Sequence, residues 1–210
     1  MIVAGAGGFA TQVVDMMAAL SKDEPIFFFD DVTPDLPSFF FGFPVLRELA
    51  MVAVELKKNN RFVLGIGAPV HRKALFEKFT ALGGILVSMV SEQAYVSRFA
   101  QYAAGICLMH QSIVEAGCSI GKGVLINNQA VLHHDCVIGD FCEISPGAKL
   151  LGRVKVGNGV SIGTNATVLP RLSIGHNVVI GAGSVVTRDI PDNSVAFGIP
   201  AKVKRNVMER

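Results

Sequence analysis

The chain has 210 residues, of which 50% are hydrophobic, and its formal charge is +2 at pH 7. This length suits one large domain or two small ones, and the apolar fraction is enough for a sizeable core. The balanced charge, without a lysine- and arginine-rich run, argues against nucleic acid as a partner. No stretch approaches the roughly 20 apolar residues of a membrane span, and the start lacks a secretory signal pattern. We therefore expect a soluble cytoplasmic protein with no membrane partner.

The first 88 residues alternate between short apolar strands and helical stretches. Strands are predicted at residues 1–4, 25–29, 61–66 and 85–87, and helices after the glycines at 5–8, ending near residue 20, and at 71–82. This alternation predicts a small α/β domain with a Rossmann-like parallel sheet. The Pro- and Phe-rich connection from Thr33 to Pro44 is expected to be an ordered loop.

Two of the predicted strands are followed by candidate nucleotide-binding residues. The run Gly5-Ala6-Gly7-Gly8 would let phosphates approach the backbone at a helix N-terminus. Asp30 and Asp31 follow the second strand, where carboxylates are well placed for a ribose or a base. The glycines do not complete a GxGxxG motif, however, and a strand–turn–helix without a ligand would look similar. Both interpretations stay open on these residues alone.

From Val90 onward the chain follows a period of six residues. Every sixth residue from Val90 to Val186 is apolar or aromatic, and every sixth residue from Ala94 to Ser184 is small or apolar. Neither an α-helix nor a strand alternation has this period. Residues that tolerate the left-handed backbone of a tight corner recur between these positions, at Gly117, Gly123, Asp135, Gly147, Gly159, Asn165, Asn177 and Gly183.

Each hexad therefore predicts one short strand and one turn, and three hexads predict a triangular coil. Such coils stack into a parallel β-helix, which we place at residues 89–210, after the α/β domain at residues 1–88. Position 152 is 18 residues, or one coil, beyond position 134, so His134 and Gly152 are expected at equivalent places on one face. The absence of a side chain at position 152 is expected to leave room for a ligand beside the histidine.

The cysteines favour a core role, and neither they nor the histidines favour a metal site. The four cysteines form no CxxC pair, and Cys118, Cys136 and Cys142 fall on inward repeat positions, as buried reduced thiols would. Three histidines share one place in their hexads but fall on three different faces of the coil: His110, His134 and His176. They cannot converge within one chain, so no metal is expected.

Both parts carry short motifs besides the repeat itself. In the first part these are the glycine run at 5–8, Phe29-Asp30-Asp31 and Ile66-Gly67. In the repeat they are His133-His134-Asp135-Cys136-Val137-Ile138-Gly139, Ser145-Pro146-Gly147-Ala148, Val168-Leu169-Pro170 and Gly198-Ile199-Pro200-Ala201-Lys202. With these motifs the chain resembles, over nearly its whole length, the sugar O- and N-acyltransferases of the hexapeptide-repeat superfamily, in particular the bacillosamine, perosamine and sialic-acid acetyltransferases.

This resemblance implies a left-handed β-helix, a homotrimer, and acetyl-CoA bound in a groove between subunits. It also implies that a nucleotide-linked amino sugar binds the N-terminal domain and is N-acetylated, for surface-polysaccharide or glycan biosynthesis. His134 would be the general base, with Asp135 raising its basicity. The contacts implied for acetyl-CoA are Glu143, the Gly152 N–H, Thr164 and Ala182. Those implied for the substrate are Gly7, Gly8, Phe9, Asp30, Asp31, Gly67 and Asn127.

Two residues depart from the family's pattern, and two other functions stay open. Glu143 stands where relatives often carry a histidine that meets acetyl-CoA, and Phe9 stands where the glycine loop often continues with histidine. The acceptor could be a hydroxyl, as in sialic-acid O-acetylation, because an amine and a hydroxyl would use the same base. The protein could also be a nucleotide-sugar-binding scaffold without turnover, although the His134–Asp135 pair argues against this.

Overall fold

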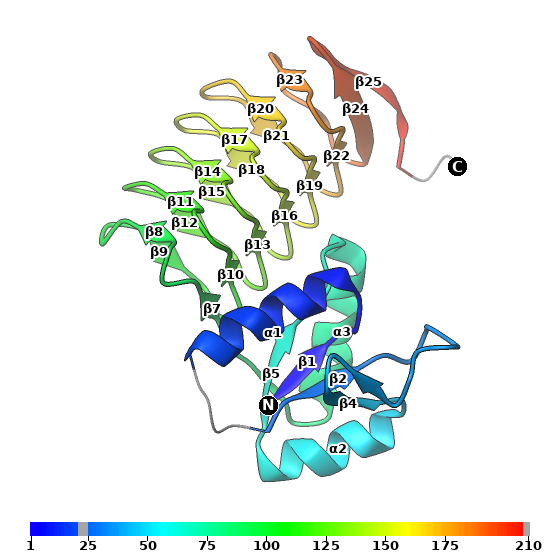
Figure 1. The fold of residues 1–210 in the computed structure, drawn as a ribbon. Helices are drawn as coiled ribbons and strands as arrows, with labels where there is room; N and C mark the ends of the chain where they lie inside the picture. The colour runs from blue at the N-terminus through cyan, green and yellow to red at the C-terminus, as the bar shows by residue number, and fades with distance from the viewer. Residues whose placement is uncertain (21–24, 208–210) are drawn as a thin grey trace. The chain divides into compact units, whose positions relative to one another are not determined.

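The computed structural model describes residues 1–20 and 25–207. It divides into two compact units, Met1–Met89 and Val90–Arg210. Figure 1 shows the fold of each unit. No helix that the structure describes is both long and apolar enough to cross a membrane.

In the residues that the structure describes, the first unit is a six-stranded sheet with three helices. The strands lie in the order β3-β4-β2-β1-β5-β6, and all neighbours are parallel except β3 and β4. In chain order the elements are β1 (Ile2–Ala4), α1 (Gly8–Leu20), β2 (Phe27–Phe29), β3 (Phe39–Phe40), β4 (Phe43–Leu46), α2 (Leu49–Lys58), β5 (Arg61–Leu64), α3 (Pro69–Ala81) and β6 (Ile85–Leu86). The predicted α/β fold with a parallel sheet is confirmed.

The core of this unit lies around the central strand β1, all three residues of which are buried. Such continuous burial is typical of a parallel strand that is covered on both faces. Phe79 of α3 packs edge-on against Phe29 of β2 at 5.3 Å between ring centroids, and it also contacts Phe62 of β5 at 5.0 Å. These ring contacts fix α3 against the sheet, beside β2 and β5.

One prediction for this unit is wrong. The connection from Thr33 to Pro44 is not only a loop, because it contains β3 and the start of β4, which form an antiparallel hairpin at the edge of the sheet. The hairpin turns at Phe41 and Gly42, which both have positive φ. Its strands are held by packing, since the Phe28 ring contacts the rings of Phe40 and Phe43 at 5.3 and 6.1 Å. Proline and glycine in the segment hide this pairing from propensity alone.

The second unit is a left-handed parallel β-helix with three faces. The first face contains β7 (Met89–Val90), β10 (Cys107–Leu108), β13 (Leu125–Ile126), β16 (Glu143–Ile144), β19 (Ser161–Ile162), β22 (Val179–Ile180), β24 (Ser194–Gly198) and β25 (Ala201–Asn206). The second face contains β8 (Tyr95–Val96), β11 (Ile113–Val114), β14 (Val131–Leu132), β17 (Lys149–Leu150), β20 (Thr167–Val168) and β23 (Val185–Val186). The third face contains β9 (Gln101–Tyr102), β12 (Ser119–Ile120), β15 (Val137–Ile138), β18 (Lys155–Val156) and β21 (Ser173–Ile174).

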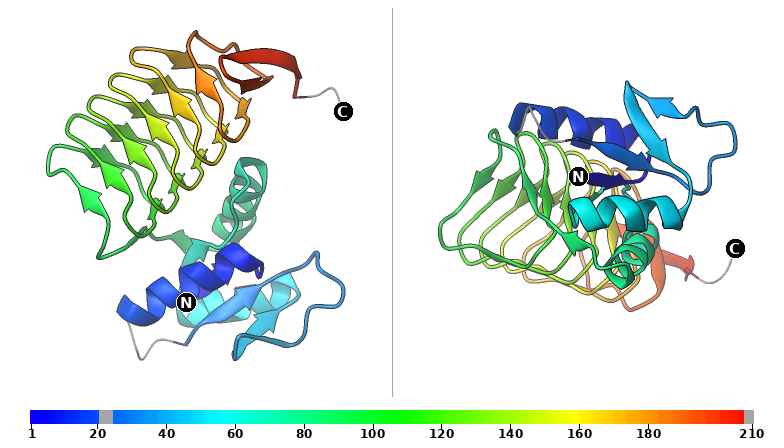
Figure 2. Two further views of the ribbon diagram at one scale, coloured as in Figure 1. Left: turned by 45° about the horizontal axis from the view of Figure 1, so that its top comes forward. Right: turned by 90° about the horizontal axis from the view of Figure 1, so that it is seen from below.

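Neighbouring strands within a face are 18 residues apart up to β22 on the first face and throughout the other two, as the period of six predicts. At the end of the first face, Val195 of β24 pairs with Val179, 16 residues earlier, and β25 pairs antiparallel with β24. Cys107 pairs with Leu125 on the first face, and Ile113 pairs with Val131 on the second. Figure 2 shows the resulting stack of coils from two further sides. We call the turns from the first to the second face the first corner, those from the second to the third face the second corner, and those from the third to the first face the third corner.

The corners repeat a left-handed backbone every six residues. All eight corner residues predicted from the sequence have positive φ, from 53° at Asn177 to 74° at Gly117. The same conformation occurs at residues that propensity does not mark: Gln111, Gln129, Phe141, Arg153 and Arg171. Left-handed backbone is unfavourable for side chains of this kind. Stacking imposes it here, because a coil can continue in register only if each corner turns as its neighbours do.

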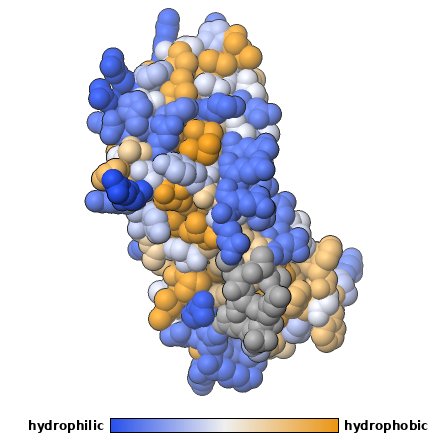
Figure 3. Space-filling view, turned by 60° about the vertical axis from the view of Figure 1, so that its left-hand side comes forward, coloured by the Kyte–Doolittle hydropathy of each residue, from blue (hydrophilic) through white to orange (hydrophobic). Residues whose placement is uncertain are grey.

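The inward repeat positions form one continuous apolar core, from Ile106 to Ala196. Tyr102 is the exception, since its side chain is exposed although it lies in phase with buried residues. Its strand β9 is the first strand of the third face, so no coil precedes it to cover the ring. On the outer surface of the coils, exposed apolar residues such as Val137 and Val179 alternate with polar ones. Figure 3 shows apolar patches separated by hydrophilic residues.

Candidate active site

A crevice of about 390 Å³ lies at the carboxyl ends of β1, β2 and β5 in the first unit. The chain leaves β1 for β2 on one side and later places β5 on the other side. Open α/β sheets bind ligands at such a topological switch point. The loops after the three strands line the crevice, together with one face of α3 that carries His71, Leu75 and Lys78.

Most of the predicted substrate residues meet at this crevice. The structure brings Gly7, Phe9, Asp30, Asp31 and Gly67 together around it. Gly8 begins α1 instead and is not among the lining residues. Phe9 presents an aromatic ring, and most of the exposed lining is apolar, so the crevice suits a flat or partly apolar ligand.

The two predicted carboxylates have different surroundings. Asp30 Oδ1 accepts the backbone N–H groups of Val32 and Thr33 at 2.9 and 2.7 Å, and Oδ2 accepts the Thr33 hydroxyl at 2.9 Å. Burial alone would raise the pKa of Asp30, but these hydrogen bonds and the Arg47 guanidinium lower it below its usual range. Asp31 forms an ion pair with Lys78 at 2.8 Å. Asp30 therefore shapes the loop, and Asp31 is tied to the α3 wall.

A buried arginine supports the third loop of the crevice. Arg72 is fully buried, and its Nη1 donates to the carbonyl oxygen of Ile66 at 2.6 Å and to that of Leu64 at 3.4 Å. Gly65 also packs closely, since a Cβ there would lie 3.0 Å from the Ala10 side chain. These contacts hold the backbone at residues 65–67 in place, next to the glycine loop after β1.

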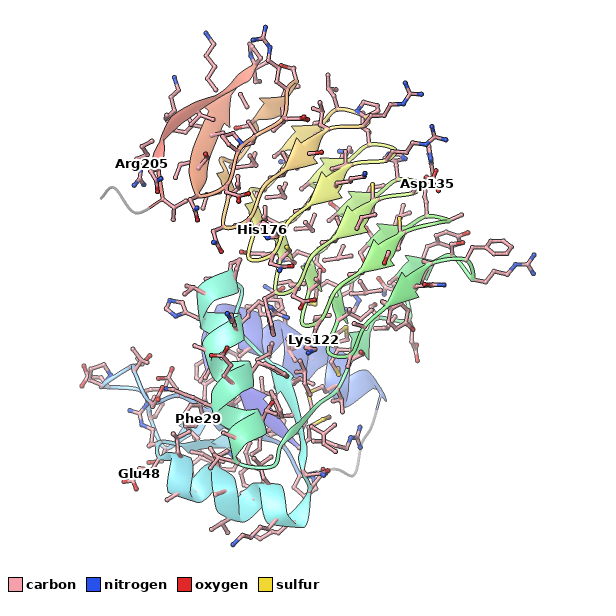
Figure 4. All side chains as sticks on the ribbon, turned by 180° about the vertical axis from the view of Figure 1, so that it is seen from behind. Phe29, Glu48, Lys122, Asp135, His176 and Arg205 are labelled. Atoms are coloured by element: carbon pink, nitrogen blue, oxygen red, sulfur yellow. The ribbon has the colours of Figure 1, made fainter. Side chains whose placement is uncertain are left out.

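The second candidate site is at the second corner of the β-helix, where His134 and Asp135 follow β14. Asp135 Oδ2 lies 3.0 Å from Nδ1 of His134 and 3.4 Å from Nε of Arg153, one coil further along. The hydrogen bond with His134 is the main reason that the pKa of Asp135 lies below its usual range, and Arg153 also lowers it. The side chain of His134 is 56% exposed, so a ligand can reach it. Figure 4 shows Asp135 at an outer corner and His176 at a different one.

Gly152 lies directly beneath the His134 ring. A Cβ at position 152 would overlap Nε2 and would lie 2.7 Å from Cε1 of the imidazole. The predicted stacking is therefore correct. The imidazole fills the place of the missing Cβ, and the space for a ligand lies beside the ring, in a hollow that both His134 and Gly152 line. The Gly152 N–H donates to no acceptor among the residues that the structure describes, whereas the Arg153 N–H donates to the His134 carbonyl at 2.9 Å.

Glu115, one coil before His134, supports the same corner. Its Oε2 accepts the backbone N–H of His134 at 3.0 Å, and its Oε1 lies 3.2 Å from Nδ1 of His133. His133 thus points to Glu115, while His134 points to Asp135. A shallow hollow of about 370 Å³ opens beside the ring, lined by His134, Gly152, Arg153, Pro170 and Arg171.

The other histidines of the repeat lie elsewhere. Nδ1 of His110 is 2.7 Å from the Ser91 hydroxyl at the first corner, and Nδ1 of His176 accepts the Asn158 N–H at 2.9 Å at the third corner. In the part of the chain that the structure describes, no three His, Cys, Asp or Glu side chains are grouped to hold a metal ion.

Comparisons with known proteins cover both units. Residues 1–79 match the PglD N-terminal domain, and residues 108–152 and 153–188 match the bacterial transferase hexapeptide of six repeats. The perosamine N-acetyltransferase of Caulobacter crescentus is 31% identical, with a TM-score of 0.89 over 98% of this chain and 96% of its own. That structure is a histidine-to-asparagine mutant in complex with CoA and GDP-perosamine.

Two further solved structures have the same extent. The acetyltransferase domain of PglB from Neisseria gonorrhoeae, in complex with acetyl coenzyme A, is 33% identical, with a TM-score of 0.88 over 97% of this chain and 98% of its own. WeeI from Acinetobacter baumannii is 25% identical, with a TM-score of 0.89 over the same shares. The comparison with curated proteins finds no match.

The chain belongs to the hexapeptide-repeat acetyltransferases that carry a PglD N-terminal domain. The resemblance seen in the sequence is thereby confirmed.

Within this acetyltransferase, the residues expected at the catalytic centre lie at opposite edges of the second face. His134, Asp135 and Gly152 are at the second corner. Asn127, Thr164 and Ala182 are at the first corner, and Glu143 is on the first face in β16. Asn127 is nearly buried and accepts the Asn128 N–H at 2.8 Å, while Glu143 accepts the Ser161 hydroxyl at 3.3 Å. The structure of one acetyltransferase chain does not bring these two sets together.

Several residues of both sites were missed from the sequence. Glu115 and Arg153 lie 19 and 18 residues from their partners His134 and Asp135, so the coil length alone could have suggested both. The wall formed by α3 shows a helical spacing, with His71, Leu75 and Lys78 at steps of four and three. Arg72 gave no signal, because burial of a charged residue is visible only in the folded chain.

Proposed function

We propose that the protein is an acetyl-CoA-dependent N-acetyltransferase that acts on the amino group of a nucleotide-linked deoxyamino sugar. The observation that carries this proposal is the His134–Asp135 pair, with the His134 ring stacked against Gly152. Two relatives over 30% identical along almost the whole chain support it: one contains CoA and GDP-perosamine, and the other contains acetyl coenzyme A.

The geometry of His134 suits a general base. Nδ1 faces the Asp135 carboxylate, so the neutral ring carries its proton there and Nε2 keeps a free lone pair. Nε2 accepts a proton from the acceptor amine as the amine nitrogen bonds to the acetyl carbon. The carbon–sulfur bond then breaks, and the proton passes from His134 to the leaving thiolate. Such a base typically contributes about 10²–10⁴ in rate.

Gly152 is placed to stabilise the negative charge that develops on the acetyl oxygen. The His134 ring packs against Gly152, and the Gly152 N–H uses no acceptor among the described residues. A single donor of this kind typically lowers a barrier by roughly 3 kcal/mol. No acetyl-enzyme is needed, so we expect direct transfer in a ternary complex.

The crevice of the first unit is the proposed site for the nucleotide part of the acceptor. The glycine loop ends at the N-terminus of α1, where backbone N–H groups and the helix dipole favour phosphate groups. Gly7, Phe9, Asp31 and Gly67 would contact the ligand, and Asp30 would hold the loop that surrounds it. In this proposal Gly8 contributes only the start of the helix.

We further propose a homotrimer in which neighbouring chains complete the site. Its support is the separation of the two residue sets, since acetyl-CoA contacts at Glu143, Thr164 and Ala182 can meet His134 only if another copy provides one of them. The outward residues of the second face between these corners include half-buried Ile113, Val131 and Val185, a surface suited to a partner. Light scattering tests this proposal, and a monomer at micromolar concentration would contradict it.

The function is tested by thiol release from acetyl-CoA with a panel of nucleotide-linked amino sugars and their hydroxyl counterparts. The variant that tests the role of the base is His134→Gln, which keeps a side chain of similar size over Gly152. Turnover on an amino sugar that falls by about 10²-fold or more in the variant supports the proposal. Turnover only on a hydroxyl sugar would move the function to O-acetylation, and binding of the sugars without turnover would indicate a scaffold.

A further inference from the structure

We propose that Arg153 is a positioning residue that holds the Asp135 carboxylate in place for His134 and weakens its pull on the histidine proton. This inference rests on the proposed function. The two residues stand one coil apart at the same corner position, so the stacking of coils brings Arg153 beside Asp135 without any other support.

One oxygen atom carries both contacts. Asp135 Oδ2 accepts from His134 Nδ1 at 3.0 Å and from Arg153 Nε at 3.4 Å. The rotation of the carboxylate is therefore limited from two sides. With 58% of the Arg153 side chain and 49% of the Asp135 side chain exposed, the ion pair adds little stability. Its main effects are to fix the orientation of the Asp135 carboxylate and to offset part of its negative charge.

The backbone points to the same role. Arg153 and Asp135 both have left-handed φ values, of 65° and 60°. Glycine or asparagine adopts this conformation with less strain, and the repeat uses them at most other corners. An arginine is therefore less favourable than a glycine for the turn at position 153. The contact of its guanidinium group with Asp135 is a contribution that a glycine could not make.

Several charged or titratable groups surround the histidine. Asp135 and His133 flank it in its own coil, Glu115 comes from the preceding coil, and Arg153 and Arg171 come from the two following coils. The thiol of Cys118 lies behind the corner, with its Sγ 3.2 Å from the His133 carbonyl. Of these groups, Arg153 is the one that shares the Asp135 oxygen, so its removal changes the charge that His134 senses through that atom.

The variants that test this inference are Arg153→Met, Arg153→Lys and Arg188→Met. Methionine removes the positive charge and keeps an unbranched stem, while lysine keeps the charge. Arg188 is an exposed arginine outside both candidate sites, so its variant is the matched control. If Arg153→Met does not fold, Arg153→Gln replaces it.

Without Arg153, Asp135 stabilises a protonated His134 more strongly. We expect the acid limb of the pH–rate profile to move to higher pH in Arg153→Met, so that the ratio of rates at pH 6 and pH 8 falls about threefold. Arg153→Lys should restore most of the wild-type profile, and Arg188→Met should match it. Identical acid limbs for wild type and Arg153→Met would overturn the inference.

A second readout separates this inference from the proposed function. NMR titration of the His134 ring needs no turnover, and its midpoint should rise in Arg153→Met by the same factor of about three in proton affinity. If wild type transfers no acetyl group but the midpoint moves, the proposed function fails and the positioning role stands. If turnover is present and the midpoint does not move, the positioning role fails alone.

Discussion

The imidazole of His134 occupies the space where a side chain of Gly152 would be, one coil further along the β-helix. Gly152→Ala should therefore push the ring away from its position against Gly152. Because a misplacement of about 1 Å at a reacting group can cost 10²-fold, we expect kcat to fall by about that factor. The fold should persist, since Gly152 is not among the residues with positive φ.

The same substitution in the His134→Gln background is the control for this mechanism. If Gly152→Ala acts by moving the histidine, the double variant should be no slower than His134→Gln alone, because residues in contact do not act additively. Additive losses would show that Gly152 contributes separately from the ring.

Glu115 anchors the backbone of His134, so its loss should reduce activity without unfolding the chain. Glu115→Ala removes the acceptor of the His134 N–H and should lower the free energy of unfolding by about 0.5–1.5 kcal/mol. Glu115→Gln keeps an acceptor oxygen and should retain more activity. Steady-state kinetics and urea unfolding of both variants check this, and equal kcat values for the two would contradict it.

Asp30 should make stability depend on pH at the acid end. Its folded pKa is below the ordinary value, so its contribution is present above about pH 4, the unfolded pKa, and is lost as the pH falls through the folded pKa. Asp30→Asn should be less stable than wild type near pH 7 by under about 1 kcal/mol, with the difference vanishing at acid pH. Thermal unfolding from pH 3 to pH 7 measures it, and a difference that grows toward acid pH would be the wrong sign.

The cysteines should be inert in the folded protein. All four, Cys107, Cys118, Cys136 and Cys142, are buried reduced thiols. Burial raises the pKa of Cys142 to about 12, whereas the hydrogen bond with the Cys136 thiol lowers the pKa of Cys118 to about 7, so Cys118 is protected by its burial alone. A chromogenic disulfide reagent should therefore react slowly with native protein and rapidly with all four thiols in denaturant. Rapid reaction of a thiol in the native state would mean that the coil opens locally.

The candidate sites could be predicted only in part. The pair of His134 and Asp135 and the stacking on Gly152 were found, but Glu115 and Arg153, which also lie about one coil from their partners, were not. The packing of the His134 ring into the place of a Gly152 side chain was not foreseen, because the rotamer of His134 depends on the space that the next coil leaves. For the crevice, the glycine loop and Asp30-Asp31 were visible after their strands, but the support from Arg72 depends on which helix covers which loop.

The sequence by itself determined the β-helix, because each coil contacts only its neighbours and the same six-residue pattern must repeat along the stack. It also determined the strand–helix alternation of the first unit and the place of the glycine loop. Only the tertiary structure decided the left-handed backbone at Gln111, Phe141 and Arg153, where stacking overrides local preference. It likewise decided the β3–β4 hairpin, which depends on packing of aromatic rings against β2, a contact between segments that local propensity does not contain.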